Sequence, residues 1–227
     1  MYRYETHLHT KPISRCAHAT VRECLEFYKS QGYQGVFISN HFIHGNIGID
    51  HSAPYEDRIR FFFSDSEEAI AIGRELGIDV FIAMELAYKG TDFLVYGPDM
   101  DFFLAHPEYE TMTVKQRLTL LAESGALIVH AHPYREAGYI DYIRLLPRHV
   151  HGVEVYNANR NSLENGMAAA YAEAYNLIPF AGTDNHVGGA QRHFGGMESE
   201  RPIRDMEDFI RLVKEGKMTP FRYDIED

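Results

Sequence analysis

The chain has 227 residues, a length that suits one large domain, two small ones or a single α/β barrel. Hydrophobic residues make up 45% of it and charged residues 24%, which excludes a disordered or low-complexity chain. With 22 basic and 33 acidic residues the net charge is −11, and such a charge disfavours general binding to nucleic acid or anionic lipid.

The sequence lacks membrane and export signals. No apolar run reaches the roughly 18 residues of a membrane span, and the first residues show no basic stretch followed by an apolar one. Cys16 and Cys24 are too few for a disulfide framework, and their spacing matches no zinc motif. We therefore expect a cytoplasmic protein with reduced thiols and no membrane association.

Strand-like apolar runs alternate with helical patterns along the whole chain. The expected strands are residues 2–9, 35–41, 79–88, 91–97, 126–132, 152–157 and 178–186. Capping boxes predict helix starts at residues 20–23, 64–67 and 113–116, and the Ala-rich residues 166–175 predict another helix. From Asp205 on, the pattern predicts one helix and a last strand.

This alternation indicates βαβ units around a parallel sheet that is buried on both faces. About seven such units predict a TIM-like α/β barrel in a single domain, residues 1–227, with a motif-bearing core in residues 1–190 and a C-terminal helix and strand in residues 200–227. An open doubly wound sheet is the alternative. It is disfavoured because the first expected strand ends in His7-Leu8-His9 and is not followed by a Gly-rich phosphate loop.

The expected strands end in metal-binding residue types, at the place where an α/β barrel carries its active site. These strand ends carry His7, His9, His41, Glu85, His130, His132, Glu154, Asn157, Asp184 and His186. Residues i and i+2 of a strand face the same side, so the pairs His-x-His and Asp-x-His can each aim two ligands at one point. Imidazoles and carboxylates suit zinc, manganese or iron. Paired ions of this kind favour hydrolysis, including phosphoryl transfer.

The order His-x-His, His, Glu, His-Pro, Asp-x-His over residues 5–186 resembles the PHP family, named for polymerase and histidinol phosphatase. The resemblance implies a distorted (β/α)7 barrel, two or three divalent ions and phosphoester hydrolysis. It also implies a first ion on His7, His9, Glu85 and Asp184, a second on Glu85 and His132, and a third on His41 and His186.

The chain departs from the family pattern at three places. After the first motif it reads Ser14-Arg15-Cys16-Ala17-His18 where many members carry an Asp, or in some a His, as a third-ion ligand, and His18 is the candidate for that position. Asn40 replaces an Asp before His41. The His expected after the bridging Glu falls near Asp92, so Asp92 or water is the expected replacement, with His106 less favoured; His130 is a further candidate beside His132.

A phosphorylated substrate also needs cationic groups from the protein. Arg135, in the loop after His132, is placed to bind phosphate with two hydrogen bonds, unless it is a plain surface arginine. Arg192 and His193 lie between two Gly-Gly pairs, which suits substrate contacts on a mobile lid or an exposed turn. His44 and His51 are further candidates for substrate contacts.

Together these features predict a metal-dependent phosphoesterase with two or three zinc, manganese or iron ions. It would cleave a small phosphomonoester by attack of a metal-bound hydroxide, with Glu85, His132 and Arg135 as catalytic residues. The alternatives are an amidohydrolase reaction, a phosphodiesterase or nuclease activity, and metal binding without catalysis. The acidic surface makes long nucleic acid an unfavoured partner. The substrate, the metal and the oligomeric state stay open.

Overall fold

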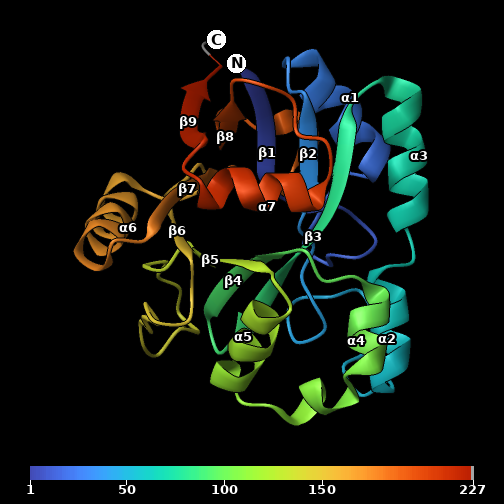
Figure 1. Ribbon diagram of the computed structural model, residues 1–227. Helices are drawn as coiled ribbons and strands as arrows, with labels where there is room; N and C mark the ends of the chain where they lie inside the picture. Colours follow the sequence, from blue (N-terminus) through green and yellow to red (C-terminus); the bar gives the residue numbers. More distant parts are fainter. Residues whose placement is uncertain (226–227) are drawn as a thin grey trace.

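The computed structural model describes residues 1–225, which form a nearly closed barrel of strands with helices around it (Figure 1). The strands are β1 (Tyr2–Leu8), β2 (Gly35–Ile38), β3 (Asp79–Tyr88), β4 (Thr91–Tyr96), β5 (Leu127–Ala131), β6 (Gly152–Asn157), β7 (Ile178–Gly182), β8 (His193–Ser199) and β9 (Met218–Asp224). The helices are α1 (Val21–Ser30), α2 (Tyr55–Phe62), α3 (Ser66–Leu76), α4 (Met100–Ala105), α5 (Val114–Glu123), α6 (Ser162–Tyr175) and α7 (Met206–Lys214), with short 3₁₀ segments η1 (Pro107–Thr111) and η2 (Gly188–Ala190). The predicted α/β barrel is confirmed.

The strands are ordered β7-β6-β5-β4-β3-β2-β1-β8-β9 in one sheet. The pairs β1–β2, β2–β3, β5–β6 and β6–β7 are parallel, whereas β4 and β8 run antiparallel to both of their neighbours. Beyond the end of β7, the Asn185 amide donates to the carbonyl of His7 (3.2 Å) and the His9 amide donates to the carbonyl of Asn185 (3.0 Å). These bonds join the segment after β7 to the end of β1, beside His7 and His9, and so close the ring of strands β1 to β7.

The sheet is less regular than a repeated βαβ unit. β4 follows β3 directly through Lys89 and Gly90, both with positive φ, so it returns antiparallel instead of crossing over. The expected loop around residues 188–196 contains β8, which the sequence did not predict. Gly195 lies inside β8, where an added Cβ would stand 2.6 Å from the carbonyl oxygen of Gly182. This glycine therefore permits close strand contact. The segment for which the sequence left open a mobile lid or an exposed turn is in part a strand paired with β9.

Helix starts follow the predicted caps in two of three cases. The capping boxes of Thr20 with Glu23 and of Thr113 with Gln116 begin α1 and α5. The expected box at Ser64 is wrong, because the Ser64 hydroxyl donates to the carbonyl of Phe61 (2.7 Å) and α3 begins after Asp65 without a side-chain cap. The box of Asn161 with Glu164 was missed, so α6 begins earlier than the predicted residue 166.

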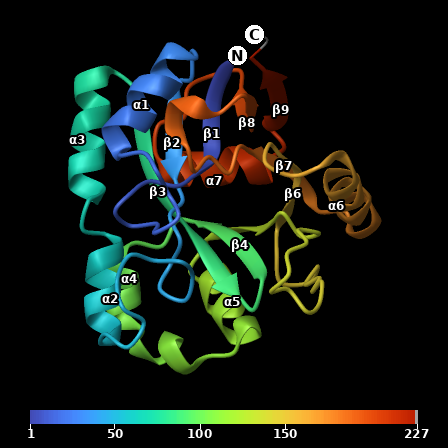
Figure 2. The same cartoon turned by 180° about the vertical axis from the view of Figure 1, so that it is seen from behind.

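The hydrophobic interior of the barrel is closed at one end by α7. Figure 1 shows α7 lying across β1 and β2, and the ring centroid of Phe209 on α7 lies 4.2 Å from that of Phe37 on β2. The other helices cover the outside, with α1 beside α3 and α2 beside α4 (Figure 2). Because α7 packs against residues near the strand starts, such as Tyr4 and Phe37, the carboxyl ends of the strands stay open.

Among residues 1–225, no helix has both the length and the apolar character that crossing a membrane requires. Cys16 and Cys24 are both free thiols.

Candidate metal centre

Two histidines of the first motif face Asp184 across the closure of the barrel. His7 lies in β1 and His9 follows it, so both rings point to the same side, and both are fully buried. The backbone bonds of Asn185 fix the neighbouring Asp184, whose Oδ1 lies 3.4 Å from Nε2 of His7 and 3.4 Å from Nε2 of His9. The three side chains form a compact set of potential ligands.

Glu85 stands at the middle of the site and is 1% exposed. Its Oε1 lies 2.9 Å from Nε2 of His132 and 3.5 Å from Nε2 of His7. Its Oε2 lies 2.6 Å from Nδ1 of His41 and 3.7 Å from Nε2 of His9. The two oxygens of one carboxylate thus face different pairs of imidazoles, which is the arrangement of a bridging ligand.

Three overlapping groups of side chains bring their ligand atoms within 4.8 Å of one another. They are His7, His9 and Asp184; His7, Glu85 and His132; and His9, His41 and His186. These seven residues were all expected from the sequence, from strands far apart in the chain.

The backbone is strained at two of these positions. His132 has φ +26° and Asp184 has φ +59°, conformations that residues other than glycine seldom adopt. Such strain costs about 1–3 kcal/mol and persists where the surroundings fix it, as they commonly do at functional sites. His132 directly follows β5 and Asp184 stands two residues after the end of β7, so both strained residues lie at the carboxyl ends of strands.

Glu154 and Asn157 on β6 form a second layer beneath the centre. Oε1 of Glu154 lies 2.9 Å from Nδ1 of His7, and Oε2 accepts from the His132 amide (2.9 Å) and from Nδ2 of Asn157 (3.0 Å). Asn157 also donates to Oδ2 of Asp184 (3.2 Å). The sequence placed both residues at a strand end but gave them no role. Their bonds orient three of the potential ligands.

Asn40 replaces the acidic family residue and also acts on the histidines indirectly. Its Oδ1 accepts from the Ser14 hydroxyl (2.8 Å) and the Thr10 amide (2.7 Å). Oγ of Ser14 in turn lies 3.0 Å from Nδ1 of His9 and accepts from the His41 amide (3.0 Å). The amide side chain thus holds a serine that orients both histidines.

The carboxylates and imidazoles of the centre shift one another's pKa values. Burial alone would raise the pKa of Glu85, yet the charge on His41 and a hydrogen bond from His132 hold that pKa well below its usual range. Burial is likewise outweighed at Asp184, whose pKa is lowered well below its usual range chiefly by His7. Burial lowers the pKa of His41, but the negative charge of Glu85 outweighs burial and raises that pKa to about 10. A site that keeps carboxylates ionised in this way attracts cations.

The donor atoms also fit metal ions individually. Among the described residues, Nε2 of His7 and Nε2 of His9 are buried and have no hydrogen-bond partner. A buried polar atom without a partner costs about 1–3 kcal/mol, so such atoms persist where something else binds them. Imidazole nitrogens and carboxylate oxygens are ligands for zinc, manganese and iron. The residues of this centre therefore fit divalent metal ions.

The structure does not bring His18 to the centre. Its side chain is exposed, and its amide donates to the carbonyl of His186 (2.8 Å). Cys16 lies there instead, with Sγ 3.1 Å from Nε2 of His41. Although burial opposes it, hydrogen bonds with His186 and His41 lower the pKa of the Cys16 thiol to about 6. Cys16 stands in the same loop as His18, but the sequence favoured the imidazole because His is the commoner ligand of such sites.

A cleft of about 500 Å³ opens above the centre. Its lining includes Glu85, Asp184, His41 and His186, together with residues that belong to none of the ligand groups. Arg135 lies on its wall, with one guanidinium nitrogen 2.6 Å from Oδ2 of Asp92 and with Nε unpartnered. Asp92 is thus engaged with Arg135 and belongs to none of the three ligand groups. The expected replacement of the family's histidine by Asp92 is not seen in the described residues.

Other candidate residues lie elsewhere in the structure. His130 stacks on Phe93 with centroids 5.0 Å apart, on the face of β5 away from the centre, and burial lowers its pKa to about 3. His106 bonds to the carbonyl of Phe102 (2.7 Å), His193 pairs with Asp224 (2.8 Å), and Arg192 donates to the carbonyl of Gly189 (3.2 Å). His51 is exposed. His44 does line the cleft, where it packs against Arg117.

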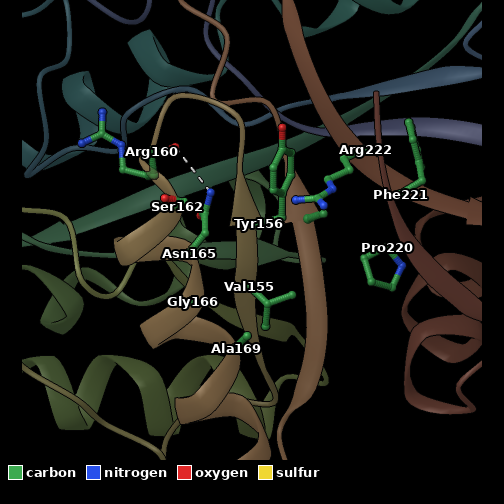
Figure 3. Close-up of a pocket in the computed structure, with 11 residues that line it drawn as sticks. Val155, Tyr156, Arg160, Ser162, Asn165, Gly166, Ala169, Pro220, Phe221 and Arg222 are labelled. Carbon is green, nitrogen blue, oxygen red and sulfur yellow. Dashed lines mark hydrogen bonds between the residues drawn. The ribbon is translucent and has the colours of Figure 1, made fainter. Parts of the chain in front are cut away.

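A second cavity of about 550 Å³ lies outside the barrel, between the start of α6 and β9. Figure 3 shows Tyr156 from β6 and Arg222 from β9 on one side of it and Ser162 and Asn165 from α6 on the other. None of its lining residues in the described chain is a member of the ligand groups. It is therefore separate from the metal centre.

No family model and no curated protein matches the sequence. Among solved structures, the chain is similar to a two-domain protein from Bacteroides vulgatus that contains a predicted PHP-like metal-dependent phosphoesterase, at 14% identity and a TM-score of 0.65. That match covers 97% of this chain and 64% of the other, so the chain spans about two thirds of its length.

Two further structures share the fold. The lesion-specific endonuclease PfuEndoQ from Pyrococcus furiosus matches with a TM-score of 0.63 and 14% identity, over 99% of this chain and 59% of that one. An amidohydrolase from Chromobacterium violaceum matches with a TM-score of 0.56 and 13% identity, over 95% and 97%. The chain therefore has the barrel fold found in PHP-like metal-dependent phosphoesterases, in agreement with its motifs.

Proposed function

We propose that this protein is a metal-dependent hydrolase that cleaves phosphoester bonds, with a small phosphomonoester as its substrate. The observation that carries the proposal is Glu85, a buried carboxylate whose two oxygens face separate pairs of imidazoles at the floor of an open cleft. The solved structures of similar fold named as phosphoesterase and endonuclease support phosphoester chemistry. We further propose that residues 1–227 act as a single domain.

In this proposal the chain's own residues hold two or three divalent ions. His7, His9, Glu85 and Asp184 would bind one, Glu85 and His132 a second, and His41 and His186 a third. Divalent ions held there would supply Lewis acidity, which activates water as a nucleophile and offsets negative charge on the phosphoryl oxygens. Zinc, manganese and iron all suit these donors.

Arg135 would bind the phosphate from the cleft wall. Asp92 holds one end of its guanidinium at 2.6 Å, which fixes the side chain before substrate arrives. The guanidinium lines the cleft, where it can donate to a phosphoryl oxygen. Glu154 and Asn157 would act as positioning residues, because they contact ligand side chains and not the cleft.

The size of the cleft supports a small substrate. Its volume of about 500 Å³ lies within the range of small-molecule pockets. The net charge of −11 disfavours long nucleic acid. We also propose a reducing, cytoplasmic setting, since both cysteines are unpaired and Cys16 lines the cleft.

Phosphate release from p-nitrophenyl phosphate and a panel of small phosphomonoesters tests the proposal. After chelator treatment we expect no turnover, and refilling with zinc, manganese or iron(II) should restore it. Glu85→Gln keeps the shape of the side chain but removes its charge, and should lower kcat/KM by at least about 100-fold.

Glu123→Gln, an exposed substitution at the end of α5, is the matched control and should match the wild type. Protein that holds ions yet releases phosphate from no member of the panel contradicts the phosphomonoester assignment. Phosphodiesters would be assayed next. Amides would follow, because a solved structure of similar fold is an amidohydrolase.

A further inference from the structure

A cysteine thiol lies at the edge of the third ligand group. Cys16 belongs to the loop between β1 and α1, and its Sγ lies 3.1 Å from Nε2 of His41. It is partly exposed and lines the cleft above Glu85 and His186. The thiol is thus accessible from the cleft and in contact with a residue of the centre.

The loop that carries Cys16 is fixed on both sides. The amide of the preceding Arg15 donates to the carbonyl of Asn46 (2.9 Å), and the amide of Ala17 donates to the carbonyl of Ser14 (3.1 Å). Two residues on, the His18 amide donates to the carbonyl of His186 (2.8 Å). The backbone therefore holds the thiol against His41 while directing the imidazole of His18 to solvent.

A second observation points to a ligand at this place. His9 is fully buried, and its Nε2 has no hydrogen-bond partner in the part of the chain that the structure describes. Its ring centroid lies 4.2 Å from that of His186 and 4.4 Å from that of His41, and the three rings each offer a nitrogen within 4.8 Å of the others. An unpaired nitrogen in a cluster of imidazoles is a donor arrangement that suits a cation, and Cys16 stands at the side of that cluster which opens to the cleft.

We propose that Cys16 is a thiolate ligand to a divalent ion held with His41 and His186, so that this subsite selects thiophilic metals. This inference rests on the proposed metal-dependent function. Ligation forms a sulfur–metal bond and releases the thiol proton to solvent. Sulfur donors favour zinc over manganese, whereas the subsites around Glu85 hold only nitrogen and oxygen donors. The chain would thus bind different metals at different positions of one centre.

Cobalt(II) is the probe that separates ligation from simple contact. Chelator-treated protein is refilled with cobalt(II), and we measure the thiolate-to-cobalt charge-transfer absorption in the near ultraviolet together with the number of ions bound per chain. The wild type should show the absorption. Cys16→Ser should lose it and should bind one ion at least about 10-fold more weakly, with the remaining ions retained.

Two variants serve as controls. Cys24→Ala removes the other thiol, which is buried on α1, and should keep both the absorption and the ion count. Cys16→Asp supplies an oxygen donor, and should restore the ion count without the absorption and shift the preference of that ion toward manganese.

Each outcome decides the proposal. Wild-type protein that binds cobalt without the sulfur absorption overturns the role of Cys16 and leaves the proposed hydrolase intact. The same holds if Cys16→Ser keeps the absorption or the affinity of every ion. Protein that binds no cobalt at all overturns both the role of Cys16 and the metal-dependent function.

Discussion

Arg135 shows how one residue can be both structural and available to a ligand. Its ion pair with Asp92 keeps the guanidinium on the cleft wall, and its Nε has no partner within the described residues. Burial lowers the pKa of Arg135, but the negative charges of Asp92 and Glu85 outweigh burial and raise that pKa. The guanidinium therefore stays cationic. A lysine would preserve the charge beside Asp92 but not the planar set of donors.

The Arg135→Lys variant should therefore bind a phosphorylated substrate less well. A hydrogen bond to a charged group is worth about 1.5–3 kcal/mol, so we expect kcat/KM to fall by about 10-fold or more, mainly through KM. Steady-state kinetics on the best phosphomonoester give the answer. Arg148→Lys, an exposed change in the same loop, is the control; equal KM values for wild type and Arg135→Lys would remove Arg135 from the substrate site.

At the scale of a single element, one buried carboxylate stabilises the start of α7. Asp208 in its first turn is 2% exposed, and it accepts hydrogen bonds from Arg201 (2.7 Å) and from the amide of Arg204 (3.1 Å). The hydrogen bonds from Arg201, ahead of all other causes, hold the pKa of Asp208 well below its usual range. These bonds fix the start of the helix that closes the barrel.

Asp208→Asn should lower the free energy of unfolding at pH 7 by about 1–3 kcal/mol, because charge-assisted bonds are lost. Since the folded state lowers the pKa of Asp208, its contribution is full above the unfolded value near 4 and fades as the pH falls below it. Urea unfolding between pH 7 and pH 3 should therefore show the two proteins converging in acid. Glu207→Gln, exposed in the same turn, should match the wild type at each pH; a constant difference for Asp208→Asn would disprove the linkage.

At the scale of the whole molecule, the centre lies at the seam where the segment after β7 meets β1. The ligand groups combine His7 inside β1 and Glu85 inside β3 with residues that follow β1, β2, β5 and β7. Buried carboxylates and unpartnered nitrogens meet at this seam. Metal binding should accordingly stabilise the closed barrel as well as the site.

Removing the ions should lower the melting temperature. An ion present at 100 times its Kd stabilises by about 2.7 kcal/mol, which for a chain of this size corresponds to roughly 5–10 °C. Differential scanning calorimetry of stripped and zinc-, manganese- or iron-loaded protein measures the shift. Glu85→Gln should respond less, and a wild-type melting temperature that no ion changes would argue against ligation at the seam.

The candidate ligands could be picked out from the sequence because their signal is local. His7-x-His9 and Asp184-x-His186 follow the two-residue repeat of a strand, and strand ends of an α/β barrel face one site. The sequence pattern could not show that β4 and β8 run antiparallel to their neighbours. The direction of a strand depends on the strands with which it pairs. The exchange of His18 for Cys16 was also hidden, since it depends on the backbone bond from the His18 amide to His186.

The same logic explains the missed second layer. Glu154 was recognised as a strand-end residue, but its bonds reach His7 and the amide of His132, which are far away in the chain. Local pattern cannot distinguish such a carboxylate from a ligand or a surface group. The role of Glu154 becomes visible only from its contacts with His7 and His132 in the folded structure.

The bonds of Asn185 that close the barrel also have a consequence for synthesis of the chain. Two of the three ligand groups combine His7 or His9 with Asp184 or His186, so before these last two residues are made a growing polypeptide can assemble only the group of His7, Glu85 and His132. Contacts of such long sequence separation form late in folding. The complete centre therefore forms only after Asp184 and His186 have been made, and an earlier nascent chain can offer an ion that one group alone.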